Sequence, residues 1–173
     1  MCGIAGVYSL EKPLPKSLYT SKDSVLSSMN HRGPDDNGVW ADAEAGIALG
    51  HKRLSVIDLS SAGHQPMVST TGRYILTYNG EIYNFLELRK ELIKQGYPLK
   101  TQCDTEIIPY LYERYGLRFL DRLNGIFAIA IWDCRKRSLY LIRDTIGVKP
   151  LVYAQVRNKI AFGSEAKAVL ASE

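Results

Sequence analysis

Cys2 directly follows the initiator methionine, and its two functional groups could act together. A small residue next to Met1 suits removal of the methionine, which would leave Cys2 with a free α-amine beside its thiol. A thiol is a good nucleophile only as a thiolate and titrates near ~8.5, whereas an α-amine titrates near ~7.7–8.0 and can accept a proton at neutral pH. One residue would then supply nucleophile and general base. On position alone, a small second residue without a chemical role is the alternative.

The segment LTYNGEIYNF, residues 76–85, places an amide, a glycine and a carboxylate side by side. The Asn79 side-chain NH₂ and the Gly80 backbone N–H are two donors that would form an oxyanion hole at ~3 Å from a developing oxyanion. Glycine would also let a substrate approach the backbone closely. Asn-Gly between β-rich runs is equally the strongest short-range signal for a hairpin with a type I′ turn. Glu81 adds a carboxylate that a plain hairpin would not need, and both interpretations stay open.

Two further charged residues could bind a charged ligand. Arg53 lies in the expected strand HKRLSVID, where an exposed cation is the alternative; pointing inward, its forked guanidinium suits a carboxylate. Asp104 in CDTEII could hold an ammonium group, although a helix N-cap also explains it. Together these residues describe one ligand, an α-amino acid that carries a side-chain amide. They would supply a site for its anion, a site for its cation, an oxyanion hole, and a nucleophile with its own base.

Other polar segments predict no chemistry by themselves. HRGPDDNG, residues 31–38, is rich in Gly, Pro, Asp and Asn and is typical of a loop with turns. Lone histidines such as His31 and His51 are typical structural residues. The three cysteines are odd in number, widely spaced and without a C-x-x-C pair, which argues against a disulfide framework. The three histidines share no short ligand spacing with them, so the sequence predicts no metal site.

Composition narrows the class of protein. The 173 residues are 46% hydrophobic and 23% charged, with a formal net charge of +4, which is typical of a globular domain. Lys and Arg are scattered, and the densest run, residues 135–137, is flanked like a hairpin turn by Asp133 and Ser138. No apolar run reaches the ~18 residues that cross a bilayer, and the N-terminus lacks the features of a signal peptide. We therefore expect a cytoplasmic protein with neither nucleic acid nor membrane as a partner.

The elements that must position these residues are short strands and a few helices. Strands are predicted by apolar stretches rich in β-branched and aromatic residues, over residues 4–10, 46–59, 73–85, 125–133, 138–144, 150–156 and 159–164. Apolar and charged residues on opposite faces predict a helix over Asn84–Gln95, with a capping box at Asn84 and Glu87. Gly96 is placed to end this helix.

Further helices are expected over Thr105–Tyr115, ended by Gly116, over residues 17–29, and from residue 164 onward. Strands in hairpin-like succession with helices between groups of them predict an α+β fold with mainly antiparallel sheets in one domain, residues 1–173. Two sheets packed face to face would explain why FAIAIW is apolar throughout instead of alternating.

The sequence resembles the class II glutamine amidotransferase domain that forms the N-terminal half of glutamine-hydrolysing asparagine synthetases. Matching blocks occur from one end of the chain to the other: MCGIAG, HRGPDDNG, LGHKRLSVIDLS, GHQPM, YNGEIYN, DTEII, LNGIFAIAIWD, RDTIGVKPLVY and FGSEAKAVL. The resemblance implies a four-layer αββα sandwich of two mainly antiparallel sheets, the N-terminal nucleophile hydrolase fold.

The resemblance also implies an activity and a role for each matched residue. Cys2 would attack the side-chain amide of L-glutamine and release ammonia, and the glutamyl thioester would be hydrolysed to glutamate. Asn79 and Gly80 would form the oxyanion hole. Arg32 in the HRGPDD loop would brace that loop over Cys2.

The substrate-binding residues follow from the same motifs. Arg53 would bind the glutamine α-carboxylate, with Val56 and Ile57 nearby on the same strand. Glu81 and Asp104 would hold the α-ammonium. No metal or other cofactor is implied for this domain.

The family's second half, a synthetase domain that uses ATP and magnesium, has no counterpart in these motifs. We expect the ammonia to pass to such a domain, in the same chain or in a separate subunit, which would make asparagine from aspartate; a homodimer stays open. If Met1 is retained, the α-amine of Cys2 is tied up in a peptide bond and the site is inactive. Two alternatives remain: an amidotransferase half that aminates a sugar or another metabolite, and a non-catalytic module that binds glutamine or a partner protein.

Overall fold

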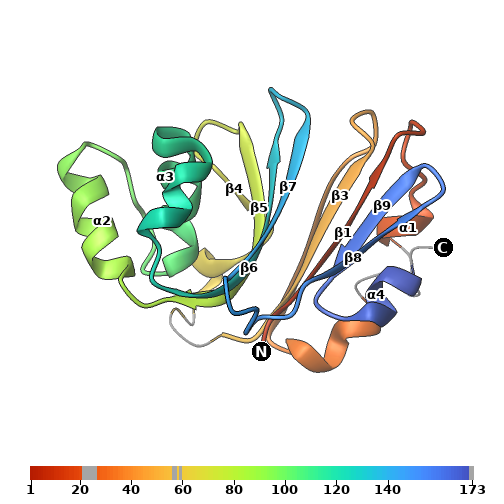
Figure 1. Cartoon of the computed structure of the whole chain (residues 1–173), viewed down its shortest axis with the longest axis horizontal. Coiled ribbons are helices and arrows are strands. Elements are labelled where there is room, and N and C mark those ends of the chain that lie inside the picture. Colours follow the sequence, from red (N-terminus) through yellow and green to blue (C-terminus); the bar gives the residue numbers. More distant parts are fainter. Residues whose placement is uncertain (21–26, 56–57, 59, 172–173) are drawn as a thin grey trace.

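Two antiparallel sheets pack face to face, and helices cover the outer face of each sheet (Figure 1). The computed structural model describes residues 1–20, 27–55, 58 and 60–171. In Figure 1, α2 and α3 lie outside one sheet, and α1 and α4 lie outside the other. The predicted four-layer αββα arrangement of an α+β fold is therefore confirmed.

All neighbouring strands run antiparallel. The first sheet has the order β2 (Asp36–Asp42), β3 (Ile47–Arg53), β1 (Gly3–Ser9), β9 (Lys159–Gly163) and β8 (Val152–Val156). The second sheet has the order β4 (Met67–Val68), β5 (Tyr74–Ile82), β6 (Gly125–Asp133) and β7 (Ser138–Arg143). The α-helices are α1 (Ser17–Thr20), α2 (Phe85–Lys94), α3 (Ile107–Tyr115) and α4 (Ala166–Leu170). Short 3₁₀ segments are η1 (Ser27–Arg32), η2 (Ser61–Gly63), η3 (Asp104–Glu106) and η4 (Gly116–Arg122).

Strand β6 is buried on both faces, as its unbroken apolar run predicts. Phe127, Ile129 and Ile131 pack into the core beneath α2 and α3. Ala130 and Trp132 point the other way and pack between the two sheets. Successive side chains of a strand alternate between faces, so a strand with a helical layer on one side and a sheet on the other needs apolar residues throughout.

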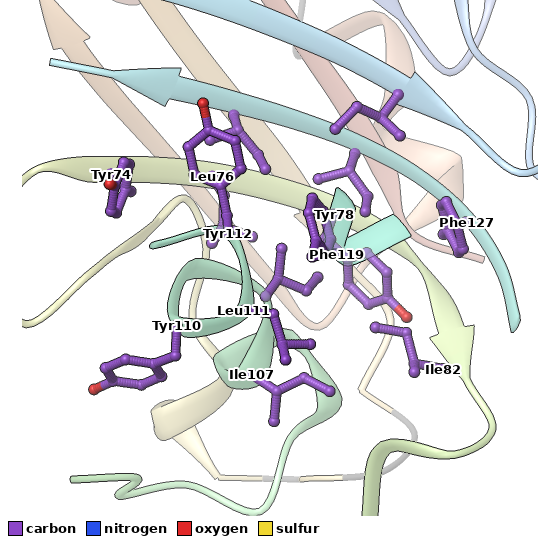
Figure 2. Packing of buried hydrophobic residues seen from close by; sticks show 14 of the residues in the cluster. Tyr74, Leu76, Tyr78, Ile82, Ile107, Tyr110, Leu111, Tyr112, Phe119 and Phe127 are labelled. Atoms are coloured by element: carbon purple, nitrogen blue, oxygen red, sulfur yellow. The ribbon is translucent and has the colours of Figure 1, made fainter. Parts of the chain in front are cut away.

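The core beneath α3 also fixes the position of Asp104, one of the candidate binding residues. Figure 2 shows Tyr74 and Tyr78 of β5 on the same side as Ile107 and Leu111 of α3, within one buried cluster. Because η3 leads directly into α3, this packing fixes Asp104 beside the end of β5.

The opposite helical layer fixes the N-terminal strand. Ala5 and Val7 of β1 pack with Ala168 and Val169 of α4, while β1 itself lies between β3 and β9. Cys2, which immediately precedes β1, is therefore attached to a central strand of its sheet.

The hairpin interpretation of Asn79–Gly80 is wrong. Strand β5 runs without a turn through both residues, and Asn79 pairs with Ala128 of β6 while Gly80 pairs with Phe127. The extended backbone is favoured over a turn because Tyr78 and Ile82, on either side of this pair, are both buried in the core beneath the helices.

Two expected helix starts also differ. The N-cap before η3 is Cys103, and the Asp104 carboxylate instead accepts hydrogen bonds from Tyr78 and Ile82, so the N-cap interpretation of Asp104 is wrong. Asn84 precedes α2 without a side-chain capping bond, because its amide contacts the Arg122 carbonyl and the Asn124 N–H.

Two helix ends and one turn lie where the sequence predicts them. Gly96 and Gly116 adopt positive φ angles of 86° and 57° just past α2 and α3, as their expected role in ending these helices requires. The run 135–137 forms the turn between β6 and β7.

Some expected bounds need correction. Within the helix expected over 17–29, residues 17–20 are α-helical and residues from 27 onward form a 3₁₀ segment; residues 21–26 lie outside the described part. The strand expected over 46–59 ends at Arg53, and the loop expected over 31–38 gives way to β2 at Asp36. None of the helices in the described ranges is long and apolar enough to span a membrane.

Candidate active site

A pocket of about 180 Å³ lies where the start of β1, the end of β3 and the end of β5 come together. It is lined by six of the residues singled out from the sequence: Cys2, Arg53, Asn79, Gly80, Glu81 and Asp104. These residues come from segments up to 102 positions apart, and the two packed sheets bring them to one place. Val56 and Ile57, predicted to lie nearby, fall outside the described residues.

The sulfur of Cys2 is held by the backbone just after β3. The Leu54 N–H donates to Sγ at 3.3 Å, and the thiol lies 3.5 Å from the Leu54 carbonyl oxygen. The backbone of Cys2 is held as well, because Nε of Arg32 donates to the Cys2 carbonyl oxygen at 2.9 Å. Glu165 in turn accepts a bond from Arg32 at 2.9 Å, and the Arg32 guanidinium lowers the pKa of Glu165 to about 2. Arg32 therefore contacts the backbone of Cys2 directly, although it is not a lining residue, and its role in bracing the loop over Cys2 stays a prediction.

Arg53 points inward, so its interpretation as an exposed strand residue is wrong. Its side chain is buried, and Nη1 donates to the Ser60 carbonyl oxygen at 2.8 Å while Nη2 donates to that of Asp58. Gly63 packs flat against the guanidinium: a Cβ at this position would lie 2.3 Å from Nη2. Backbone carbonyls thus aim the fork into the pocket without neutralising its charge.

Three N–H groups of β5 point away from β6 toward the pocket. The Tyr78 N–H donates to Oε1 of Gln65 at 2.7 Å, and the Ile82 N–H donates to Oδ2 of Asp104 at 3.1 Å. Because backbone direction repeats every two residues in a strand, the Gly80 N–H between them points to the same side. Gln65 and Asp104 occupy the flanking donors, and the Gly80 N–H faces the pocket that Gly80 lines.

The side-chain amide of Asn79 has an unused donor. Asn79 is only 2% exposed, and its Nδ2 has no hydrogen-bond partner among the described residues. A buried amide N–H without a partner costs about 1–3 kcal/mol, so such a group marks a place where a ligand atom can supply the partner. Nδ2 of Asn79 and the Gly80 N–H are therefore available donors in one pocket.

Glycine at position 80 has a packing reason that the sequence did not reveal. A Cβ there would lie 2.5 Å from the Ile126 carbonyl oxygen and 2.8 Å from the Phe127 Cα. The close approach of β6, and not only that of a substrate, therefore requires glycine.

The two acidic residues occupy different environments. The Asp104 carboxylate is buried, and burial raises its pKa although Tyr78 donates its hydroxyl at 2.6 Å. Burial likewise raises the pKa of Tyr78, which therefore stays a neutral donor. Glu81 is exposed at the pocket rim. The pocket thus has one carboxyl group in its buried part and one at its rim, and Arg53 lines the same pocket.

A buried histidine ties the two sheets together beside the donors. The ring Nε2 of His51 on β3 lies 3.0 Å from the Tyr78 carbonyl oxygen, and burial lowers the pKa of His51 to about 4. The neutral ring therefore donates to β5 and helps to fix the stretch that carries Asn79. This agrees with the structural role expected of a lone histidine.

Sequence reasoning assigned no role to several other lining residues. Gln65 and Lys149 belong to the motifs GHQPM and RDTIGVKP, and Tyr78 immediately precedes Asn79. Their place in or beside these motifs was the signal in the sequence that could have marked them as site residues. Their contacts depend on loops whose paths the sequence pattern does not specify.

The chain is similar to known proteins over almost its whole length. The family model described as "Glutamine amidotransferase domain" matches residues 1–173. "Asparagine synthetase [glutamine-hydrolyzing] 3" of Bacillus subtilis (strain 168) is 42% identical over 173 residues, covering 99% of this chain and 28% of the relative. "Amidase chry2" of Gibberella zeae is 37% identical over 160 residues, covering 92% of this chain and 23% of the relative. The chain thus spans about a quarter of the length of these curated relatives.

Solved structures show a similar fold. The glutamine phosphoribosylpyrophosphate amidotransferase of B. subtilis, complexed with ADP and GMP, superposes with a TM-score of 0.82 over 99% of this chain and 43% of that chain. Its sequence identity is 21%, so the likeness concerns the fold. From the family match over its whole length and from the pocket, we conclude that this chain belongs to the glutamine amidotransferase domain family.

Proposed function

We propose that this domain hydrolyses the side-chain amide of L-glutamine to glutamate and ammonia through a thioester on Cys2. The observation that carries the proposal is the convergence, in one pocket, of a thiol, two available N–H donors, an inward-pointing guanidinium and two carboxylates. This set matches the α-carboxylate, the α-ammonium and the amide of a single amino acid.

Charge complementarity orients the substrate. Arg53 binds the α-carboxylate of glutamine with its forked donors, and Glu81 and Asp104 hold the α-ammonium. The amide tail then extends toward Cys2, with its carbonyl oxygen directed to the donors of Asn79 and Gly80.

Acylation begins after Met1 has been removed. The free α-amine of Cys2 takes the thiol proton, and the sulfur forms a bond to the amide carbon of glutamine. The carbonyl oxygen becomes an oxyanion that accepts hydrogen bonds from Asn79 Nδ2 and the Gly80 N–H. The resulting ammonium of Cys2 returns its proton to the amide nitrogen, the carbon–nitrogen bond breaks, and ammonia leaves a glutamyl thioester.

Deacylation uses the same groups. The Cys2 amine takes a proton from water, the hydroxide oxygen attacks the thioester carbon, and the same two donors stabilise the second oxyanion. The carbon–sulfur bond breaks and the sulfur regains its proton, which releases glutamate. These steps need no metal or other cofactor.

The destination of the ammonia is also part of the proposal. The relatives called glutamine-hydrolyzing asparagine synthetases support delivery to a synthetase domain that makes asparagine from aspartate, with ATP and magnesium bound there. The mild net charge and the three free cysteines support a cytoplasmic location without nucleic acid or membrane as a partner.

The test is glutamate release by protein of known N-terminus. Mass spectrometry gives the fraction of chains that begin at Cys2, and an enzymatic assay gives glutamate formed from glutamine. Turnover should be proportional to that fraction, because retained Met1 ties up the α-amine of Cys2, which takes the thiol proton in the proposed mechanism. Turnover that does not change with this fraction would contradict the mechanism, and absent turnover in fully processed protein would contradict the function.

Gly63→Ala should impair substrate binding without touching the substrate. The added Cβ would lie 2.3 Å from Nη2 of Arg53, so the guanidinium must leave its present position. Losing one charge-assisted bond to the carboxylate costs about 1.5–3 kcal/mol, which corresponds to a roughly ten- to hundredfold rise in KM. Steady-state kinetics would show this rise with a smaller change in kcat.

The neighbouring exposed Ala62 provides the control for this prediction. Ala62→Ser should keep the parental KM. Arg53→Lys, which keeps the charge but loses the fork, should reproduce the effect of Gly63→Ala. Parental KM values in both Gly63→Ala and Arg53→Lys would remove Arg53 from carboxylate binding.

A further inference from the structure

The connection between β7 and β8 is built to present one lysine. Asp144 accepts hydrogen bonds from the backbone N–H groups of Val148 at 2.9 Å and Lys149 at 3.1 Å. It also accepts one from the Phe127 N–H at 3.2 Å, which anchors the connection to β6. Arg143 donates to the carbonyl oxygens of Lys149 at 2.9 Å and Gly147 at 2.6 Å. Both backbone groups of Lys149 are thus fixed by charged side chains.

The side chain of Lys149 lines the pocket beside the N-terminus. Lys149 is 7% exposed, and its Nζ lies 3.9 Å from Sδ of Met1. No carboxylate lies within ion-pair distance of this ammonium among the described residues. A buried ammonium whose neighbour is a thioether is costly, since a thioether accepts hydrogen bonds only weakly.

The substrate does not need this charge. Arg53 matches the α-carboxylate of glutamine, Glu81 and Asp104 match the α-ammonium, and the amide is neutral. Lys149 remains as a cation without a partner on the substrate. Its contact with Met1 instead directs it to the first residues of the chain.

We propose that Lys149 is a positioning residue of the glutaminase reaction, which holds the α-amine of processed Cys2 in its free-base form. This inference rests on the proposed function. Removal of Met1 takes away the thioether and creates an amine in the same pocket. A cation nearby disfavours a second positive charge, so the amine stays unprotonated and ready to take the thiol proton.

Other titratable and charged groups face Lys149 and set the background. Cys2, Tyr78, Glu81, Cys103 and Asp104 line the same pocket, together with Arg53. On its own connection, the charges of Arg143 and Asp144 are bound to backbone groups. In the substrate complex, the ligand's α-carboxylate offsets Arg53 and its α-ammonium offsets one of the two carboxylates. Lys149 is then the lining cation that the ligand does not neutralise, and its Nζ lies beside the N-terminal residue.

The pH dependence of glutamate release tests the inference. In processed Lys149→Met protein, loss of the cation should raise the pKa of the amine and move the acidic limb of kcat/KM upward by roughly 0.5–1 pH unit. Activity should fall roughly three- to tenfold below that limb and approach the parental value at high pH. Lys149→Arg should restore the parental limb, and Lys136→Met in the exposed β6–β7 turn is the matched control.

Two results would overturn the role of Lys149 while leaving the glutaminase proposal intact. The first is that the parent and the Lys149→Met protein are both active and show the same acidic limb of kcat/KM. A raised KM without a shifted limb would be the other, because it would assign Lys149 to the substrate carboxylate. An inactive processed parent would contradict the proposed function itself.

A second measurement requires no turnover. The rate at which the N-terminal amine of processed protein reacts with acetic anhydride, followed by mass spectrometry across pH, reports the titration of that amine. The midpoint should rise by the same 0.5–1 unit in Lys149→Met, and in Lys149→Gln if the methionine variant folds poorly. An unchanged midpoint in a folded variant would contradict the inference.

Discussion

A Cys2→Ala protein is expected to lose glutamate release by roughly 10⁴- to 10⁶-fold, as enzymes do when a nucleophile is removed. Alanine is also small, so removal of Met1 is unaffected and the terminal amine is still formed. The pocket would still bind glutamine, because Arg53, Glu81 and Asp104 are unchanged. The variant should therefore bind the substrate in a calorimetric titration while failing to turn it over.

Cys134 provides the control for this prediction. Burial raises the pKa of the Cys134 thiol, which therefore stays protonated, and Cys134 lies in the turn between β6 and β7 and does not line the pocket. Cys134→Ala should keep the parental rate. Burial also raises the pKa of Cys103, whose sulfur contacts the Thr101 hydroxyl, so this pocket residue cannot replace Cys2. Parental activity in Cys2→Ala would end the proposed mechanism.

The fold could be predicted where burial alone determines the pattern. The unbroken apolar run of β6 requires cover on both faces, and the structure supplies helices on one face and a sheet on the other. Strand β2 escaped prediction because Asp36, Asn37 and Gly38 are residues typical of turns. In the structure they pair with Arg53, Lys52 and His51 of β3, and this pairing outweighs local propensity.

The candidate site could be predicted where one residue carries a distinctive group. Cys2 combines thiol and amine whatever the fold, and Arg53 has a fork that suits a carboxylate. Which donors are free could not be predicted. The availability of the Gly80 N–H depends on Gln65 and Asp104 occupying its neighbours, and these side chains lie 15 and 24 residues away in the sequence. Such contacts emerge only once loops and strands are placed.

Replacing Asn79 tests the proposed oxyanion hole, since Asn79 would supply its side-chain donor and Gly80 its backbone donor. Asn79→Ala is expected to lower kcat by roughly 10²–10³ with little change in KM, because the lost bond forms only when charge develops on the substrate oxygen. The remaining activity reflects the Gly80 N–H, which no substitution of Asn79 removes. Steady-state kinetics on processed protein would measure the split between kcat and KM.

Stability separates this role from a structural one. Asn79 Nδ2 has no partner among the described residues, so removing this donor breaks no hydrogen bond to them, and Asn79→Ala should melt close to the parental temperature. Asn37→Ala, which changes an exposed strand residue, is the matched control and should alter neither kcat nor melting. If Asn79→Ala instead melted much earlier and kept its kcat, Asn79 would be a residue that supports β5. If Asn79→Ala has a low kcat but parental stability, the unpaired Nδ2 of Asn79 acts by stabilising the transition state and not by stabilising the fold.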